Sequence, residues 1–552
     1  MPTLPSLPFA KLLLVSAIAM TFTACGGGSD HDDEVVTPPP PPPPVVMAGD
    51  VFVLTTSNKL LSFDRATPAT IRSTASVTGL QAGENLLGID FRPADGQLYG
   101  VGSTGRIYTL NGVTGVATVK ATLAADASDS TAPYTALAGT EFGVDFNPVA
   151  DRLRIVSNTG QSLRINVDTG ATTTDGNING GAANTGITAA AYTNSFAGTA
   201  STTLFVIDAA NATLYTQNPP NNGTLASAVP LGVAATGVAG FDIDARTNTG
   251  YAVMTVAGVR NLYTLNLAAA TAPATLVAAI GVTEELHGIA LKGPGAPVAY
   301  GLTDDARIVT FKTATPNTLD ANVAVTGLAA GERLLGFDIR PKDGLLYGVS
   351  STGRIVTIDP ATGAATVKAT LVADAADASA PYTAIAGTAF GVDFNPVADR
   401  LRVIGNTGQS LRINVDTGAT TTDGAVNRAG ATPTVTAAAY SNSFTGTTAT
   451  MLFDIDTASA ALALQNPPND GTLVNVGALG VAVAGDVGFD IAGGANGLVL
   501  AALRTSATGP SSLYRIDLAT GAAVLSGGAA APAASAIGNG TVGLVDIAIA
   551  LK

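Results

Sequence analysis

The feature that most constrains the fold is a long internal repeat. The segments GVDFNPVADRLR and TGQSLRINVDTGATTTDG occur within Phe142–Gly176 and occur again, unchanged, within Phe390–Gly424. Both passages alternate apolar and polar residues between Asn-Pro and Thr-Gly turns, which indicates an antiparallel meander without helical periodicity. Other positions keep the same offset, as Asp242 and Asp490 do. The chain is therefore a duplicated β protein.

A shorter period lies inside each copy. A strand of the form Gly-apolar-Asp-apolar recurs as GIDF at 88–91, GVDF at 143–146 and GFDI at 240–243, and each is followed by a turn and two further strands. Meanders that repeat every ~40–55 residues are typical of β-propeller blades. We count about five blades in each copy.

The ends of each copy predict how it closes. The first copy begins with VFVLTT, a second strand without its first, and ends with LHGIALK, a first strand without its second. Pairing them would complete a blade and cover two sheet edges. The C-terminal DIAIALK and the segment VAYGL can do the same for the second copy. We therefore predict an all-β fold of two tandem β-propellers, at 48–293 and 294–552. One ten-bladed ring stays open as the alternative, because GIALKGPGAPVAYGL also reads as one hairpin.

Composition excludes several classes of function. The chain has 27 Lys+Arg against 41 Asp+Glu, a net charge of −14, and no basic run that could follow a phosphate backbone. This argues against nucleic acid and against anionic membrane surfaces as partners. One cysteine permits neither an intrachain disulfide nor a thiolate metal cluster. Only two histidines, His31 and His287, exclude a duplicated His-dependent active site.

The N-terminus predicts export. Residues 1–24 hold one lysine and then an apolar run, a pattern typical of a signal peptide. The ending Phe-Thr-Ala before Cys25 resembles the lipobox of bacterial lipoproteins, which implies acylation of Cys25. Residues 25–47 continue with a Gly-rich acidic stretch and the proline run Pro38–Pro44, a tether that would hold the propellers away from the membrane. Gly26, with no Asp there, resembles outer-membrane lipoproteins, and we expect membrane contact only through the lipid.

Recurrent aspartates are the first candidate for chemistry. They fall on the strand expected to line each central channel, and they are Asp90, Asp145, Asp242, Asp338, Asp393 and Asp490, with Asp546 as a seventh. A ring of carboxylates could bind a cation or act as acid and base on a sugar. Repetition at the same place in successive blades favours a structural role instead, in which each carboxylate accepts backbone N–H bonds from its neighbour.

A second candidate is a calcium loop. Asp175, Asn177 and Asn179 followed by Gly180 fit the opening of the D-x-[DN]-x-[DN]-G pattern. The closing glutamate is missing, and the second copy has lost most of the ligands. An Asn/Gly-rich turn is the simpler interpretation, so we expect no cofactor, with Ca²⁺ as the alternative.

Arginines on adjacent predicted strands form the third candidate. They are Arg152, Arg154 and Arg164 in the first copy, and Arg400, Arg402 and Arg412 in the second. They could clamp an anionic ligand bidentately, or they could pair with nearby acids such as Asp151 and Asp168.

Three long segments carry a family resemblance. LLGIDFRPADGQLYGVGSTGRIYTL, GTEFGVDFNPVADRLRIVSNTGQSLRINVDTG and QNPPNNGTL closely resemble the bacterial family named domain of unknown function 4394. The resemblance covers 51–292 and 299–552, so it implies a tandem pair of propeller-like domains in an envelope or secreted protein. It implies no activity and supplies no site residues.

Two functions follow as hypotheses. No nucleophile elbow, P-loop, dinucleotide fingerprint or HExxH motif is present. We therefore expect a non-catalytic module or scaffold that binds a polysaccharide or protein of the cell envelope. The alternative is a carboxylate-dependent glycosidase or lyase acting on polysaccharide in a propeller mouth.

Overall fold

The computed structural model of the chain describes residues 48–528 and 532–551. It consists almost entirely of short β-strands. The predicted signal peptide, the lipidation site Cys25 and the tether at 25–47 lie outside the described residues.

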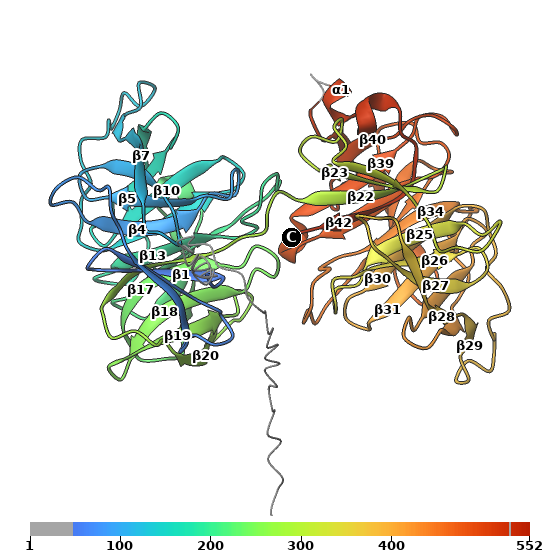
Figure 1. Cartoon of the computed structure of the whole chain (residues 1–552), viewed down its shortest axis with the longest axis horizontal. Helices are drawn as coiled ribbons and strands as arrows, with labels where there is room; N and C mark the ends of the chain where they lie inside the picture. Colours follow the sequence, from blue (N-terminus) through green and yellow to red (C-terminus); the bar gives the residue numbers. More distant parts are fainter. Residues whose placement is uncertain (1–47, 529–531, 552) are drawn as a thin grey trace, which may run out of the picture. The chain divides into compact units, whose positions relative to one another are not determined.

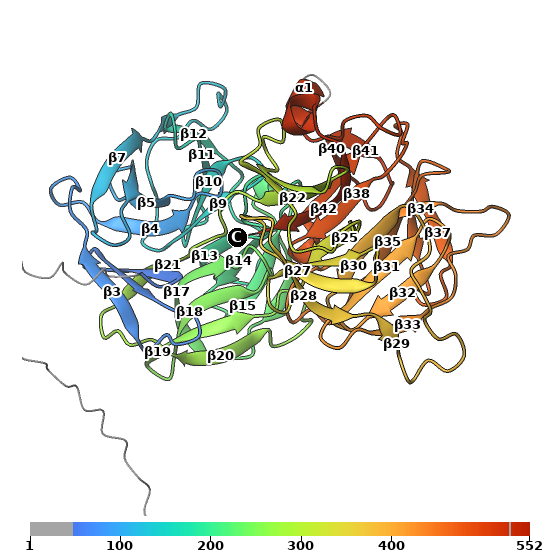
Figure 2. The same cartoon turned by 45° about the vertical axis from the view of Figure 1, so that its right-hand side comes forward.

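The first copy forms five sheets, coloured blue to green in Figure 1. In order of pairing they are β21 (Leu286–Leu291), β1 (Val51–Thr55), β2 (Lys59–Phe63) and β3 (Ile71–Ser76); β4 (Leu86–Phe91), β5 (Leu98–Gly102), β6 (Arg106–Leu110) and β7 (Ala117–Thr122); β9 (Phe142–Asn147), β10 (Arg152–Ser157), β11 (Ser162–Ile165), β12 (Ala171–Thr174) and β8 (Ala124–Ala125); β13 (Ile187–Tyr192), β14 (Leu204–Asp208), β15 (Thr213–Gln217) and β16 (Leu225–Pro230); β17 (Ala235–Ile243), β18 (Gly250–Val256), β19 (Val259–Leu265) and β20 (Ala274–Ala279). Figure 2 shows β13, β14 and β15 side by side as one blade.

The second copy repeats this plan with five further sheets. They are β42 (Leu544–Ala550), β22 (Val298–Thr303), β23 (Arg307–Lys312) and β24 (Ala321–Ala324); β25 (Leu334–Ile339), β26 (Leu346–Ser350), β27 (Arg354–Ile358) and β28 (Ala365–Thr370); β30 (Phe390–Asn395), β31 (Arg400–Gly405), β32 (Ser410–Ile413), β33 (Ala419–Thr422) and β29 (Val372–Ala373); β34 (Val435–Tyr440), β35 (Leu452–Asp456), β36 (Ala461–Gln465) and β37 (Leu473–Ala478); β38 (Gly488–Ala492), β39 (Leu498–Leu503), β40 (Ser512–Ile516) and β41 (Ala523–Leu525).

Each copy closes on itself. β1 pairs antiparallel with β21, with Val51 opposite Leu291. β22 pairs antiparallel with β42, with Val298 opposite Ala550. In both copies the last strand thus becomes the innermost strand of the blade that the first strand began, which removes two open edges. The prediction of two tandem propellers of five blades each is confirmed, and the single ten-bladed ring is not formed.

The innermost strands of each copy form a ring. In the first copy β4 contacts β9, β9 contacts β13, and the series continues through β17 and β21 back to β4. β25, β30, β34, β38 and β42 make the same ring in the second copy. The strands approach so closely that a Cβ atom on Gly143 would lie 2.5 Å from the backbone nitrogen of Ala190. Glycine is therefore required where this ring packs backbone against backbone.

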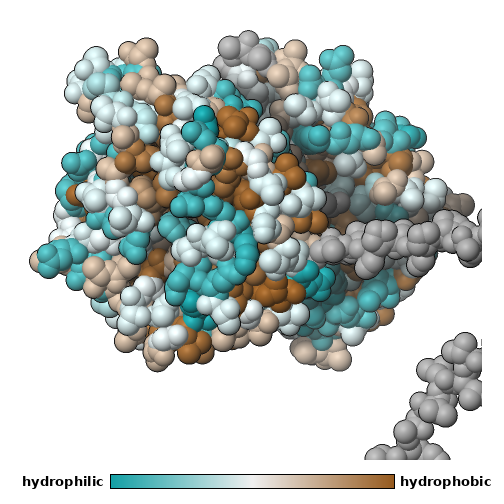
Figure 3. Space-filling view, turned by 60° about the vertical axis from the view of Figure 1, so that its left-hand side comes forward, coloured by the Kyte–Doolittle hydropathy of each residue, from teal (hydrophilic) through white to brown (hydrophobic). Residues whose placement is uncertain are grey.

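Apolar side chains fill the spaces between neighbouring blades. One such core joins Tyr99 of β5 with Val144 and Phe146 of β9, and the rings of Tyr99 and Phe146 make a T-shaped contact with their centroids 5.3 Å apart. Full burial of a side chain of this size contributes about 1.5–3 kcal/mol. On the face drawn in Figure 3, hydrophobic residues in brown are interspersed with white and teal ones.

Helical structure is confined to short connections. They are η1 (Pro220–Asn222), η2 (Gly494–Asn496), α1 (Pro532–Ser535) and η3 (Ile537–Gly540). Within the described ranges, no helix has the length and apolar character needed to cross a membrane.

Candidate functional site

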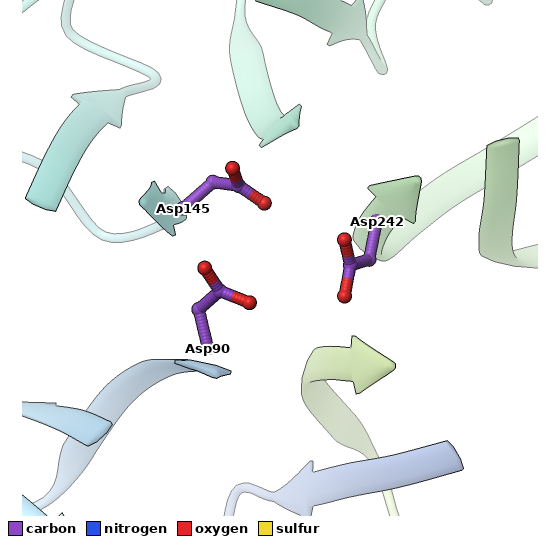
Figure 4. A group of neighbouring side chains, drawn as sticks. All are labelled: Asp90, Asp145 and Asp242. Carbon is purple, nitrogen blue, oxygen red and sulfur yellow. The ribbon is translucent and has the colours of Figure 1, made fainter. Parts of the chain in front are cut away.

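Three aspartates converge in the ring of inner strands of the first copy. Asp90 on β4, Asp145 on β9 and Asp242 on β17 are 1–3% exposed. One carboxylate oxygen from each lies within 4.8 Å of the others. Figure 4 shows the three carboxylates pointing toward a common centre from three different strands. We call this group the first triad.

Each triad aspartate accepts one backbone N–H bond that crosses between blades. Asp90 Oδ1 accepts from Phe91 N at 2.7 Å, and its Oδ2 accepts from Phe146 N of the next inner strand, also at 2.7 Å. Asp242 makes the same bridge to Leu291 N at 2.6 Å. Asp145 Oδ1 accepts from Tyr192 N at 3.0 Å. Each aspartate therefore fastens its own strand to the following one, which is the structural role that repetition favoured.

The second copy contains an equivalent group, the second triad. Its members are Asp338, Asp393 and Asp490, whose oxygens also lie within 4.8 Å of one another. Asp393 Oδ1 accepts from Tyr440 N at 2.9 Å, as its counterpart does in the first copy.

Asp546 is not a member of the triad, although the sequence grouped it with the recurrent aspartates. In β42, Ala548 holds the place that the triad aspartates hold in their own strands. Asp546 lies two residues before it, opposite Leu302 in the sheet. From there Asp546 Oδ2 accepts from Phe337 N at 3.0 Å. It fastens β42 to β25 from a different register.

Burial sets the protonation of both triads. Burial raises the pKa of Asp90 and of Asp145 well above the usual value, and the neighbouring carboxylates raise it further. Burial raises the pKa of Asp242 to about 7 and that of Asp490 to about 6. Three buried carboxylates at this spacing cannot all carry a negative charge without a counter-ion. They therefore either share protons or bind a hard cation such as Ca²⁺.

Little space lies beside the first triad: a space that reaches Asp242 has a volume of about 120 Å³, and the glycine-lined end of the channel is narrower still. The space lined by Gly88, Gly143, Gly240, Gly288 and adjacent residues has a volume of about 10 Å³. That is about one water molecule. A sugar ring cannot enter between the carboxylates from this side.

The calcium-loop residues are engaged in a different way. Asp175 is buried and accepts from Arg154 Nη1 at 2.5 Å and from Arg164 Nε at 2.8 Å. The amide nitrogen of Asn179 donates to the carbonyl oxygens of Asn177 and Asn222. Two guanidinium groups therefore neutralise the carboxylate on which the calcium interpretation depends.

Arg154 is the centre of a buried network rather than an open anion clamp. Its side chain is 1% exposed and donates to Tyr192 Oη, Ser162 Oγ and Asn221 Oδ1 in addition to Asp175. Arg402 repeats these contacts in the second copy, with Asp423 as its acid.

The other predicted arginines divide into two kinds. Arg164 binds Asp175 through two nitrogens, and this hydrogen bond raises its pKa; Arg412 does the same with Asp423. Arg152 donates to the carbonyl oxygens of Ala150 and Asp151, and Arg400 repeats this. The structure thus brings Arg154 and Arg164 together on one acid, and leaves Arg152 outside that group.

A second arginine network was not predicted from the sequence. Arg92 follows β4 and donates to Asp151 and to Asp168 of the next blade, with both oxygens of each acid engaged. These bonds hold the pKa of Asp168 near 2. Arg340 makes the same contacts in the second copy. Asp151 and Asp168 are far from Arg92 in sequence, so no local spacing of residues predicts these contacts.

A polar pocket lies between two loops of the first copy. It has a volume of about 260 Å³. The β10–β11 turn forms one wall and the loop between β12 and β13 forms the other; the lining residues are Ser157, Asn158, Thr159, Gly160, Ile178, Asn179, Gly180, Gly181, Ala182, Thr185 and Ile187. We call it the loop pocket.

The second copy differs where it corresponds to the loop pocket. Arg428 stands at the position of Gly180, and its Nη1 donates to Asp456 at 2.6 Å. Nearby, Asp454 is fully buried in place of Val206, and neither of its carboxylate oxygens has a partner among the described residues. Burial raises the pKa of Asp454 to about 8.

Comparison with known families agrees with the duplication. The model of the family described as domain of unknown function (DUF4394) matches twice, at residues 59–290 and 307–537. The chain belongs to this family. Its two matched ranges each cover most of one propeller, so the family unit is a single ring of blades.

Other comparisons add little to this assignment. No curated protein matches the chain. Among solved structures, the Dos1 propeller is 12% identical, with 64% of this chain and 90% of that one covered and a TM-score of 0.23. A protein from Lactobacillus plantarum is 15% identical, with 63% and 95% covered and a TM-score of 0.25. The computationally designed Ika8 protein is 12% identical, with 77% and 97% covered and a TM-score of 0.20. At these scores the propeller assignment rests on the strand pairing itself.

Proposed function

We propose that this protein is a non-catalytic binding module or scaffold of the bacterial cell envelope, which presents two DUF4394 propellers to a polysaccharide or protein partner. We further propose that it is exported and anchored to the outer membrane through an acylated Cys25. The sequence pattern at 1–47 supports this second part.

One observation carries the binding role. The acids that could do chemistry in the channel accept the N–H groups that hold the blades together, as Asp90 does with Phe146. The glycine-lined end of the channel has a volume of about 10 Å³, and the space that reaches Asp242 has a volume of about 120 Å³. A carboxylate used as a fastener in so narrow a channel is poorly placed to attack or protonate a substrate.

Duplication supports a scaffold role in a second way. Arg154 and Arg402 lie in matching buried networks, so the same frame supports the loops of both propellers.

The experiment measures binding and bond cleavage on the same sample. Full-length protein, with the lipid attachment replaced by a soluble tag, is applied to an array of bacterial envelope polysaccharides, and retained glycans are then assayed for new reducing ends and unsaturated products. We expect retention without product formation. Product formation that scales with protein concentration would overturn the proposal in favour of a glycosidase or lyase, and an array without retained glycan restricts the proposal to a protein partner.

A further inference from the structure

The loop pocket of the first propeller combines space, polar lining and fixed walls. It opens at the end of the β10–β11 hairpin and is bounded by the DGNING segment that resembled a calcium loop. Its volume of about 260 Å³ is smaller than the ~300–1,000 Å³ of sites for drug-sized ligands. The space therefore suits one small ring rather than an extended chain.

Hydrogen bonds hold both walls in place. Ile178 N donates to Gly160 O at 2.9 Å, which ties the loop to the hairpin turn. Asn179 N donates to Gly223 O at 2.9 Å, and Leu225 N donates back to Asn179 O at 2.9 Å. The loop is thus joined to two neighbouring segments, so a ligand would meet a formed site with little ordering left to do.

The lining offers hydrogen bonds without charge. No acidic or basic side chain lines the pocket. Asp175, the charged residue of the same loop, is already bound by two arginines. The N–H groups of Gly180, Gly181 and Ala182 donate to no described group. Because the amide nitrogen of Asn179 is committed to two carbonyl oxygens, its Oδ1 is left to accept.

Apolar surface completes the site. Ile178 and Ile187 line the same pocket, with Ile187 packed in the core behind it and Ile178 against that core. Donors, an acceptor and a small apolar surface, all without formal charge, match the alternating hydroxyl and C–H faces of a pyranose ring. A cation would find no carboxylate among the lining residues, and an anion would find no basic side chain to balance it.

We propose that the loop pocket of the first propeller binds one uncharged sugar unit of a glycan. This inference rests on the proposed binding function and names its ligand class and location. The second propeller lacks the site, because Arg428, Ala429 and Pro433 replace Gly180, Gly181 and Thr185, and the guanidinium group of Arg428 is held by Asp456.

The test uses full-length soluble protein and single methyl glycosides. The neutral probes are the methyl glycosides of glucose, galactose, mannose and N-acetylglucosamine, and the charged comparators are glucuronic acid and glucosamine. Saturation-transfer NMR detects contact, and a titration gives the dissociation constant, which we expect on the order of 1 mM for at least one neutral probe. Ala182→Trp places a large side chain in the pocket from an exposed position. Gly180→Arg imports the residue of the second copy.

A matched control separates the site from general effects. Ala429→Trp puts the same bulk on the corresponding exposed loop of the second propeller. We expect Ala182→Trp and Gly180→Arg to weaken neutral-sugar binding at least ~10-fold, a change of about 1.4 kcal/mol, while Ala429→Trp leaves it unchanged. Melting curves of all three variants exclude unfolding as the cause, and Ala182→Trp decides the matter if Gly180→Arg melts early, because Gly180 has a φ of +79° that suits glycine.

Three results would overturn the inference. They are binding of no neutral glycoside, equal binding of charged and neutral sugars, and undiminished binding by folded Ala182→Trp. If the intact protein still retains glycans on the array in any of these cases, the proposed function stands and only the location and class of its ligand are wrong.

Discussion

The two propellers share their frame, and one of the places where they differ is an interface between blades. In the first, Val206 pairs across the sheet with Tyr215, and both lie in an apolar core. In the second, Asp454 pairs with Ala463 at the same place. The loss of the tyrosine ring accompanies the arrival of the buried acid and of Arg428 in the adjacent loop. The inner strand beside it is nearly identical in the two copies, ITAAAY in β13 and VTAAAY in β34, so the frame tolerates a polar exchange one strand away from the ring.

Comparison of the two copies shows which parts of the repeat are constrained. The triads, the Arg154 and Arg402 networks and the Arg92 and Arg340 networks recur with matching contacts. All of them join elements that are distant in sequence. The loop pocket and the core around Val206 face no such requirement, and there the copies have diverged. Divergent positions are therefore the better guide to a binding role that one copy has and the other lacks.

The largest expected effect comes from importing the buried acid into the first propeller. Val206→Asp places a carboxylate beside Tyr215 with no arginine at position 180, so it buries an acid without a partner. We expect the first propeller to lose about 3–5 kcal/mol of stability. Hydrogen exchange followed by mass spectrometry, with peptides resolved for each copy, should show the loss in residues 187–230 only. A loss below ~1 kcal/mol would mean that the two interfaces are equivalent after all.

The reverse change should stabilise the second propeller. Asp454→Val removes two carboxylate oxygens that have no partner among the described residues. Because burial raises the folded pKa of Asp454 to about 8, above the unfolded value of ~3.9, its contribution is most favourable at low pH and is lost as the pH rises toward 8. We expect a gain of about 1–3 kcal/mol at pH 8 that shrinks at pH 5. Denaturant unfolding at both values measures it, and a loss at pH 8 would indicate that Asp454 has a stabilising partner.

The triads should make both propellers respond to pH in the same direction. Their folded pKa values are raised, to about 7 for Asp242 and about 6 for Asp490. Stability from the protonated carboxyls is therefore present below the unfolded pKa of ~3.9 and lost as the pH rises through 6–7, by up to about 1.4 kcal/mol per pH unit for each group. Asp242→Asn and Asp490→Asn should flatten the dependence in their own copies. Stability that rises from pH 5 to pH 8 in either copy would contradict the assignment.

The smallest effects are expected at two half-buried arginines. Arg152 and Arg400 donate to backbone carbonyl oxygens in a turn. Arg152→Ala and Arg400→Ala should each change stability by less than ~0.5 kcal/mol and should leave glycan retention unchanged. A selective loss of acidic-glycan retention in either variant would restore the anion-clamp hypothesis for these residues.

Much of the fold could be predicted from the sequence because it depends on local patterns of residues. The recurring GVDF-type strands gave the blade count, and the incomplete first and last strands gave the closure of β1 with β21. Their repetition also favoured a fastening role for Asp90 and Asp145, which their hydrogen bonds match.

The remaining features depend on partners that sequence does not place. Arg92 meets Asp151 and Asp168 across a blade boundary, and no spacing rule joins them. Asp175 fitted a calcium motif because the motif describes its neighbours along the chain, whereas its actual partners come from two other strands. Comparison of the two copies position by position would have drawn attention to Asp454 and Arg428, since each replaces an uncharged residue of the first copy.

The most direct test of the account concerns the role of the triad aspartates. Asp145→Ala and Asp393→Ala each leave one buried N–H, of Tyr192 or Tyr440, without its acceptor. Thermal and denaturant unfolding should show a loss of about 1–3 kcal/mol in the affected propeller, equal in the two copies, while glycan retention at a permissive temperature is unchanged. Unchanged stability together with the loss of a glycan-cleaving activity present in the unmodified protein would contradict the fastening role and make the triad an active site.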